Sequence, residues 1–181
     1  MMYAIASMLD VESDSITREL WDWIQSVCGM LEIKSSPIPH FSWLIGEEPD
    51  LAQIETALRK ISTITEPFQV QVSGIGIFTG TNLVMYLGLN KTKQMLQLHS
   101  YIWNHLSINK TGSGMFYHPN EWIPHITLAY RDTDHERLAC AIDGLAFDFQ
   151  TLQITINQIG VIYQNLDEYG IAMNFVLAGK E

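Results

Sequence analysis

The sequence predicts an α+β fold, built as one bilobal domain around a central cleft. Stretches with alternating apolar residues, typical of strands, are interleaved with stretches in which apolar residues recur every three or four positions, typical of helices. The order helix, strand, helix, strand, strand occurs twice, over approximately 13–90 and 91–178, which indicates an internal repeat. Such a repeat places related strands about a pseudo-two-fold axis. No linker separates the two units, so we expect a single domain over 1–181.

A predicted strand over 2–10 precedes the first half, which begins with a helix that Ser13 or Asp14 caps and Gly29 closes. Its remaining elements are a strand over 38–45, a helix opened by Pro49 and ended before Pro67, and a hairpin of strands 68–78 and 83–89.

The second half repeats this order. It contains a predicted helix over 91–107, a looser stretch over 108–121 and a strand over 122–130. Thr133 and Glu136 form a candidate capping box for the last helix. Strands over 147–163 and 170–177 complete the chain.

Composition limits the classes of partner. The 181 residues are 47% hydrophobic and 17% charged, as in globular proteins, and the net charge is −10. That charge argues against binding along a long RNA, which needs many Lys and Arg contacts, but allows a small phosphorylated ligand in a local pocket. No apolar run reaches the ~18 residues that cross a membrane, and the first residues lack the basic start of a signal peptide. We therefore expect a cytoplasmic protein, without membrane contact, that is a monomer.

The two cysteines, Cys28 and Cys140, both lie within apolar helical patterns. This placement predicts buried free thiols, as in a reducing cytoplasm, and neither a disulfide framework nor a zinc cluster.

Two short stretches stand out for chemistry. Pro39-His40-Phe41-Ser42 and Pro124-His125-Ile126-Thr127 each place a His and a hydroxyl two positions apart on a strand, and hence on one face. The two histidines are 85 positions apart, and a second pair of similar segments, around Gly76 and Gly160, is offset by 84. The agreement of the two offsets favours two equivalent strands that face each other across the cleft.

Two imidazoles in one cleft form an acid/base pair. With unperturbed pKa values near ~6.5, one ring can be neutral and one charged near pH 7. The neutral ring takes a proton from the attacking oxygen, and the charged ring protonates the leaving oxygen. The hydroxyls of Ser42 and Thr127 would donate to the phosphate oxygens on which negative charge develops, so the set suits in-line displacement at a phosphodiester without a metal.

These paired motifs resemble the His-x-Thr/Ser motifs of the two-histidine (2H) phosphoesterase superfamily, and most of all its 2′-5′ RNA ligase/cyclic phosphodiesterase branch. The resemblance covers the whole chain. It implies a bilobal fold with two antiparallel sheets around the cleft, helices outside, and no cofactor. It also implies hydrolysis of 2′,3′-cyclic phosphates or 2′-5′-linked nucleotides and RNA ends, and in some members 2′-5′ RNA ligase activity. His40 and His125 become the acid/base pair, with Ser42 and Thr127 on the phosphate oxygens.

The sequence departs from the family pattern at two positions. Ser42 stands where Thr is commoner, and Tyr130 stands where members often carry Arg. Arg131 follows one position later; it has the strand parity of His125 and is our candidate for a phosphate contact. Tyr3, Tyr163 and Trp43 are further candidates for lining the substrate site, Trp43 by base stacking or else by packing against a helix.

Other interpretations compete. The two histidines could be half-buried strand residues bonded to backbone, and the cleft could belong to a non-catalytic nucleotide- or oligonucleotide-binding module. The other histidines, His99, His105, His118 and His135, lack the spacing of a metal pair, so we expect no metal site. The 108–121 stretch is either a lid over the cleft or a passive connection.

Overall fold

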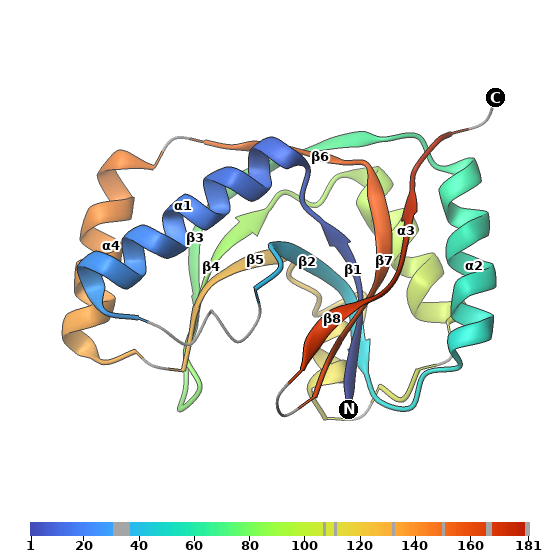
Figure 1. Ribbon diagram of the computed structural model, residues 1–181, viewed down its shortest axis with the longest axis horizontal. Helices are drawn as coiled ribbons and strands as arrows, with labels where there is room; N and C mark the ends of the chain where they lie inside the picture. Colours follow the sequence, from blue (N-terminus) through green and yellow to red (C-terminus); the bar gives the residue numbers. More distant parts are fainter. Residues whose placement is uncertain are drawn as a thin grey trace.

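The chain folds as an α+β protein, seen in a computed structural model that describes residues 1–30, 37–106, 108–110, 112–131, 133–149, 151–165 and 168–179 (Figure 1). The strands are β1 (Met2–Met8), β2 (His40–Gly46), β3 (Phe68–Phe78), β4 (Val84–Leu89), β5 (His125–Tyr130), β6 (Gln153–Ile156), β7 (Gln158–Gln164) and β8 (Tyr169–Val176). The helices are α1 (Val11–Cys28), α2 (Leu51–Ile64), α3 (Lys93–His105), the 3₁₀ segment η2 (Gly112–Tyr117) and α4 (His135–Asp148). The α+β class is confirmed.

The strands form one antiparallel sheet in the order β6-β3-β4-β5-β2-β1-β7-β8. Its two four-stranded halves meet between β5 and β2, through the residue pair Phe41–Ile126. The expectation of two separate sheets is therefore wrong. The two motif strands pair directly with each other, and this pairing joins the halves into one sheet.

Each half of the sheet carries its own helices (Figure 1). Helix α1 packs on α4 and on β5, whereas α2 packs on β7 and β8, and α3 packs on β2. Among the described residues, no helix combines the length and the apolar character needed to cross a membrane.

The strand order is symmetric about the β2–β5 junction. Strands β1 and β4 lie next to the motif strands, and β7 and β3 follow. Two equivalent repeat units would give this order, and the bounds of 13–90 and 91–178 remain a prediction.

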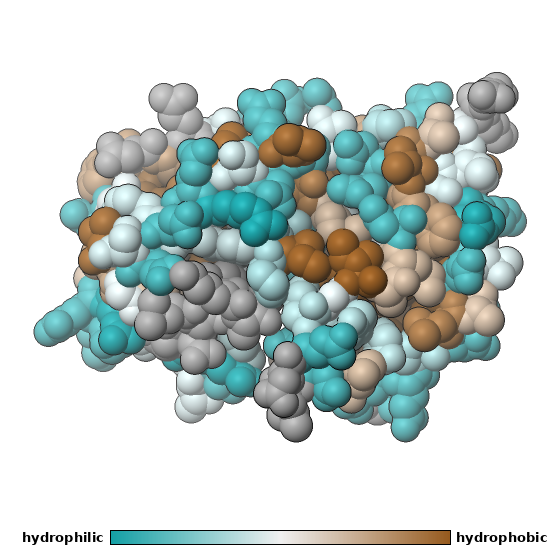
Figure 2. Space-filling model, viewed as in Figure 1, coloured by the Kyte–Doolittle hydropathy of each residue, from teal (hydrophilic) through white to brown (hydrophobic). Residues whose placement is uncertain are grey.

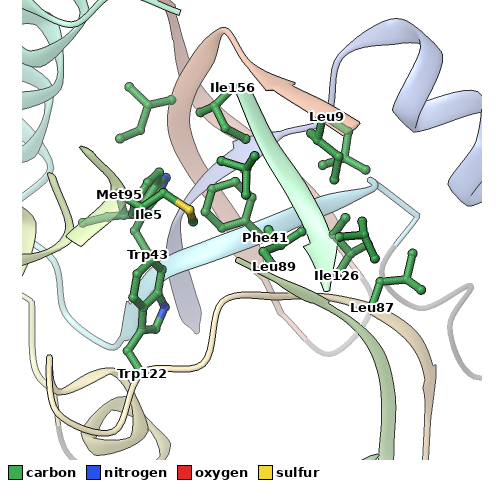
Figure 3. Packing of buried hydrophobic residues seen from close by; sticks show 14 of the residues in the cluster. Ile5, Leu9, Phe41, Trp43, Leu87, Leu89, Met95, Trp122, Ile126 and Ile156 are labelled. Carbon is green, nitrogen blue, oxygen red and sulfur yellow. The ribbon is translucent and has the colours of Figure 1, made fainter. Parts of the chain in front are cut away.

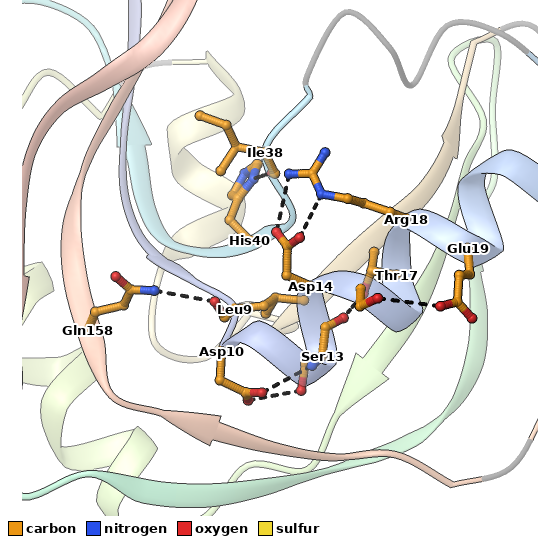
Figure 4. Close-up of polar contacts among 11 residues, drawn as sticks. Leu9, Asp10, Ser13, Asp14, Thr17, Arg18, Glu19, Ile38, His40 and Gln158 are labelled. Atoms are coloured by element: carbon orange, nitrogen blue, oxygen red, sulfur yellow. Dashed lines mark hydrogen bonds and ion pairs between the residues drawn. The ribbon is translucent and has the colours of Figure 1, made fainter.

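The helix ends follow local side-chain chemistry. The carboxylate of Asp10 caps α1 by accepting from the backbone N–H of Ser13, and Gly29 closes that helix with a φ of 73° (Figure 4). The predicted cap at Ser13 or Asp14 is wrong, because Ser13 is the donor to Asp10. Asp134, not the predicted Thr133, caps α4.

The main core lies between the helices and one face of the sheet. Figure 3 shows Phe41 and Trp43 of β2 and Ile126 of β5 within it, and all three are fully buried. A smaller apolar cluster lies on the opposite face and consists of Ala4, Ala6, Met8 and Ile162. Hydrophobic side chains also gather at the surface over β7 and β8 (Figure 2), where Ile171 and Val176 are exposed.

The cysteine prediction is wrong. Cys28, at the end of α1, forms a disulfide with Cys140 of α4. The sequence pattern placed both residues on buried helix faces, which is correct for Cys28, but it could not show that α1 and α4 pack against each other. That packing brings together two cysteines that are 112 positions apart.

Candidate active site

The four motif side chains lie together at the β2–β5 junction. Phe41 and Ile126 face each other in antiparallel register and point into the core, so their neighbours point to the opposite face. Continuing this register places His40 level with Thr127, and Ser42 level with His125. The two histidines then occupy diagonal positions on the neighbouring strands, and the Cα atoms of such positions are about 7–8 Å apart in a regular sheet. The register therefore brings both imidazoles and both hydroxyls to one face of the sheet, where its two halves meet.

Both imidazoles are held in the same way. Nδ1 of His40 donates to the carbonyl oxygen of Ile38 at 2.7 Å (Figure 4), and Nδ1 of His125 donates to that of Ile123 at 2.7 Å. A carbonyl oxygen can only accept, so the proton of each neutral ring lies on Nδ1 and Nε2 is free to take a proton. The competing interpretation, backbone bonding, is thus part of the arrangement: one nitrogen is used to orient each ring.

Both imidazoles have lowered pKa values. The pKa of His40 is lowered from 6.5 to about 4, mainly because burial removes water from the imidazole. The hydrogen bond to Ile38 raises this pKa in part, and a positive charge on His125 lowers it. Desolvation also lowers the pKa of His125. Both rings are therefore mainly neutral at pH 7 without substrate, which corrects the expectation of one neutral and one charged ring. A bound phosphate would raise both pKa values, because a negative charge favours the protonated ring.

Two indole N–H groups donate to backbone carbonyl oxygens of the motif strands. Trp122 donates to the carbonyl oxygen of Ser42 at 3.1 Å, and Trp21 of α1 donates to that of Thr127 at 3.0 Å. The sequence gave no sign of these hydrogen bonds, because the partners are 80 and 106 positions away.

Both strands are also irregular at the same point. The register with β1 shifts at Trp43, and the register with β4 shifts at Leu128, in each case directly after the hydroxyl residue. Such a bulge bends a strand and changes which face the following residues take. The two motifs are therefore alike in backbone shape as well as in composition.

Aromatic side chains surround His125. Tyr86 of β4 pairs with Thr127 of β5, and its ring centre is 5.1 Å from that of His125. The Phe78 ring lies edge-on to His125, with the ring centres 4.9 Å apart. The Tyr86 ring lies directly over Gly76, where any Cβ would collide with it. The glycine that marked the repeat in the sequence thus has a packing role here.

Three of the predicted substrate contacts are wrong. Trp43 is fully buried in the core, where its indole donates to Ser7 at 2.9 Å, so it cannot stack on a base. Ala4 of β1 and Ile162 of β7 pair with each other and lie on the same face of the sheet as His40. Tyr3 and Tyr163 form the adjacent pair of these strands. The two tyrosines therefore point to the other face, where the Tyr163 hydroxyl donates to Glu168 at 2.8 Å.

Arg131 does not follow the strand parity that we assigned to it. It lies just beyond β5 with a φ of 69°, and its guanidinium carbon is 4.5 Å from the centre of the Tyr130 ring. Tyr130 pairs with Val84 of β4, and Thr127 pairs with Tyr86, two residues further along that strand. Tyr130 and Thr127 therefore point to the same face of the sheet, which is the face of the site. The charge of Arg131 is thus held on a ring at the edge of that face, and its contact with phosphate remains a prediction.

The remaining candidates lie elsewhere. His99 is buried and stacks on Trp122 at 3.8 Å, and His105 stacks on Tyr101. Within the described ranges, no group of three or more His, Cys, Asp or Glu side chains is arranged to hold a metal ion.

Comparison with known proteins then identifies the family. The family model described as "2'-5' RNA ligase superfamily" matches residues 20–168. The chain belongs to this superfamily. A relative from Oceanobacillus iheyensis, named "Putative phosphoesterase OB1230", is 26% identical over 133 residues, 72% of this chain and 73% of its own. Membership in the superfamily indicates a phosphoesterase activity.

Two solved structures share this fold over nearly the whole chain. The crystal structure of TT0787 of Thermus thermophilus covers 100% of both chains with a TM-score of 0.66 and 19% identity. That of E. coli LigT complexed with NADP+ covers 97% of this chain and 96% of its own, with a TM-score of 0.58 and 15% identity. At these identities the likeness establishes the fold alone.

Proposed function

We propose that the protein is a metal-independent phosphodiesterase that hydrolyses a 2′,3′-cyclic phosphate or a 2′-5′-linked nucleotide or RNA end. One observation carries this proposal: two imidazoles, each with Nδ1 bonded to a carbonyl and Nε2 free, flank one junction together with two hydroxyls. The ligand named for E. coli LigT, NADP+, is also a nucleotide with phosphate groups.

The reaction needs one neutral and one protonated imidazole. Nε2 of the neutral ring takes a proton from water as the water oxygen bonds to phosphorus. The bond from phosphorus to the leaving oxygen breaks on the opposite side, and the protonated ring gives its proton to that oxygen. Ser42 and Thr127 donate to the two non-bridging oxygens. The product is a phosphomonoester, and both rings return to their starting forms after one proton exchange with solvent.

The same groups can act in the reverse direction. If a ribose 5′-hydroxyl replaces water as the nucleophile, its oxygen bonds to the phosphorus of a 2′,3′-cyclic phosphate, the bond to the 3′-oxygen breaks, that oxygen takes the proton of the charged ring, and a 2′-5′ bond remains. Joining of RNA ends by this route is the finer part of the proposal.

The test is hydrolysis of 2′,3′-cyclic nucleotides in the presence of EDTA. We expect turnover by the wild type and a loss of ~10²–10⁴-fold in kcat for His40→Ala and for His125→Ala, because each removes one proton-transfer group. His105→Ala is the matched control, since His105 is exposed on α3. Nucleotide binding without turnover of any cyclic or 2′-5′-linked substrate would instead establish a binding module.

A further inference from the structure

The two halves of the sheet differ at one equivalent position beside the hydroxyls. Ser42 of β2 pairs with Ala6 of β1. Thr127 of β5 pairs with Tyr86 of β4. Because β1 and β4 are the outer neighbours of the two motif strands, Ala6 and Tyr86 occupy equivalent places on the face of the site. One half therefore presents a methyl group next to its hydroxyl, whereas the other half presents a phenol ring.

The ring of Tyr86 belongs to a cluster of three rings. It stacks on the ring of Phe78, with the ring centres 4.2 Å apart, and the Phe78 ring in turn lies edge-on to His125. Gly76 of β3 makes room for this cluster, since a side chain there would collide with the Tyr86 ring. Phe78 and Tyr86 are both half-buried, so part of each ring surface stays accessible. The cluster thus offers an aromatic surface directly beside one imidazole of the site.

An imidazole at this junction is held without such rings. His40 makes the same bond from Nδ1 to a carbonyl oxygen as His125, at the same distance of 2.7 Å, and both residues are half-buried. The apolar residues beside His40 on this face are aliphatic, and the ring centre of Tyr169 is 6.5 Å from that of His40. Orienting a histidine therefore does not explain the stacked pair of Phe78 and Tyr86, which has no counterpart in the other half.

Resting on the proposed function, we propose that Phe78 and Tyr86 form a nucleobase subsite: they stack on the base of the nucleoside whose phosphate lies at the two imidazoles. In hydrolysis of a 2′,3′-cyclic phosphate, phosphorus carries a nucleoside on one side and meets a water molecule on the other. Only the nucleoside side needs an aromatic surface, and the small side chain of Ala6 suits the side that water enters. Stacking uses the π-face that every base has, so all four bases should be accepted.

A ratio of specificities tests this subsite. We compare kcat/KM for a nucleoside 2′,3′-cyclic phosphate with kcat/KM for the 2′,3′-cyclic phosphate of methyl riboside, which has no base. The wild type should prefer the nucleotide by roughly tenfold or more, the value of stacking one base. Tyr86→Ala copies the residue of the other half and should abolish most of this preference. Phe78→Leu, which keeps an apolar side chain, should reduce it as well.

The matched control is Tyr169→Leu, which removes the ring near His40 instead. It should change kcat/KM for both substrates by the same factor and so leave the ratio unchanged. A wild-type ratio in both Tyr86→Ala and Phe78→Leu would overturn the subsite, as would a wild type that does not prefer the nucleotide.

A second measurement does not depend on turnover. Isothermal titration calorimetry with adenosine 2′-monophosphate and with inorganic phosphate separates the base from the phosphate. Tyr86→Ala should bind the nucleotide roughly tenfold more weakly and inorganic phosphate as the wild type does. Equal losses for the two ligands, or no loss for either, would overturn the subsite. If the wild type hydrolyses no diester, the proposed function fails, while the titrations still decide whether Phe78 and Tyr86 bind a base.

Discussion

The two halves of the sheet present the same chemistry to the site in different surroundings. On the β3–β4–β5 side, His125 lies among rings, with Phe78 and Tyr86 within 5.1 Å. On the β2–β1–β7–β8 side, the ring of Tyr169 is farther from His40, at 6.5 Å. The cluster beside His40 is built of Ala4, Ala6, Met8 and Ile162. The imidazole orientation, the hydroxyl, the bulge and the indole anchor are duplicated, whereas the walls are aromatic on one side and mainly aliphatic on the other.

This difference matches what the proposed reaction requires. The phosphate is nearly symmetric, so its two sides can be served by two equivalent His and hydroxyl pairs. The groups that flank the phosphate are unlike each other, so the walls need not match. A duplicated fold can therefore keep its catalytic centre symmetric while the substrate-facing surfaces diverge.

The two halves should differ least in their hydroxyls, so we expect a large loss of activity when either hydroxyl is removed. We expect Ser42→Ala and Thr127→Val each to lower kcat by ~10²-fold or more, since each removes one donor to the non-bridging oxygens, on which charge develops. Steady-state hydrolysis of a cyclic nucleotide measures this, with Ser15→Ala on the exposed face of α1 as control. Wild-type kcat in either variant would show that this half only supports the fold.

A second test concerns the disulfide, which links helices on the β3–β4–β5 side alone. In the chain-entropy account, closing a loop of about this length stabilises a protein by roughly 4–5 kcal/mol. We expect Cys28→Ser combined with Cys140→Ser to lose a free energy of unfolding of this order in urea titrations. Reductant should have the same effect on the wild type and none on the variant. Equal stability of the two proteins would show that the thiols contribute as free residues.

The indole anchors allow a finer comparison. Trp21→Phe and Trp122→Phe keep aromatic packing but remove the N–H donors to Thr127 and Ser42. We expect kcat/KM to fall by up to about tenfold in each, the value of one hydrogen bond. Trp103→Phe is the control, because its ring contacts Lys110 and His118 instead. An unchanged kcat/KM in both variants would mean that sheet pairing alone holds the motifs.

The sequence predicted most of the secondary structure and the central constellation, because these depend on local pattern. Strand alternation placed His40 with Ser42 and His125 with Thr127, and the repeat offset brought the two strands together. The predictions failed where tertiary contacts decide. Tyr3 and Tyr163 were assigned to the site without knowledge of sheet register, and Arg131 was given a parity that its left-handed backbone breaks.

The residues that hold the motif strands in place could not be predicted from the sequence, for the same reason. Trp21 and Trp122 donate to residues that are 106 and 80 positions away, and nothing local distinguishes them from core aromatics. The disulfide likewise depends on the packing of α1 on α4.

The pH dependence gives the most sensitive test of the two halves. The free enzyme needs one neutral and one protonated imidazole. A plot of kcat/KM against pH should therefore be bell-shaped, and its acidic and alkaline limbs report the two pKa values. Burial lowers both, His40 to about 4. The proton on the acid is therefore lost below pH 6.5, and we expect the optimum of kcat/KM on the acidic side of 6.5. An optimum above pH 7 would contradict the lowered pKa values.

Phe78→Ala then tells the two histidines apart. Loss of the ring that lies edge-on to His125 admits water, and reduced desolvation raises the pKa of that imidazole. The Phe78 ring packs on His125 and Tyr86 in the other half of the sheet from His40, so mainly one limb of the bell should move upward. Movement of the alkaline limb would show that His125 has the higher pKa of the two imidazoles, and movement of the acidic limb would show that it has the lower one. If neither limb moves while Phe78→Ala remains folded, His125 does not titrate in catalysis, and the paired mechanism is wrong.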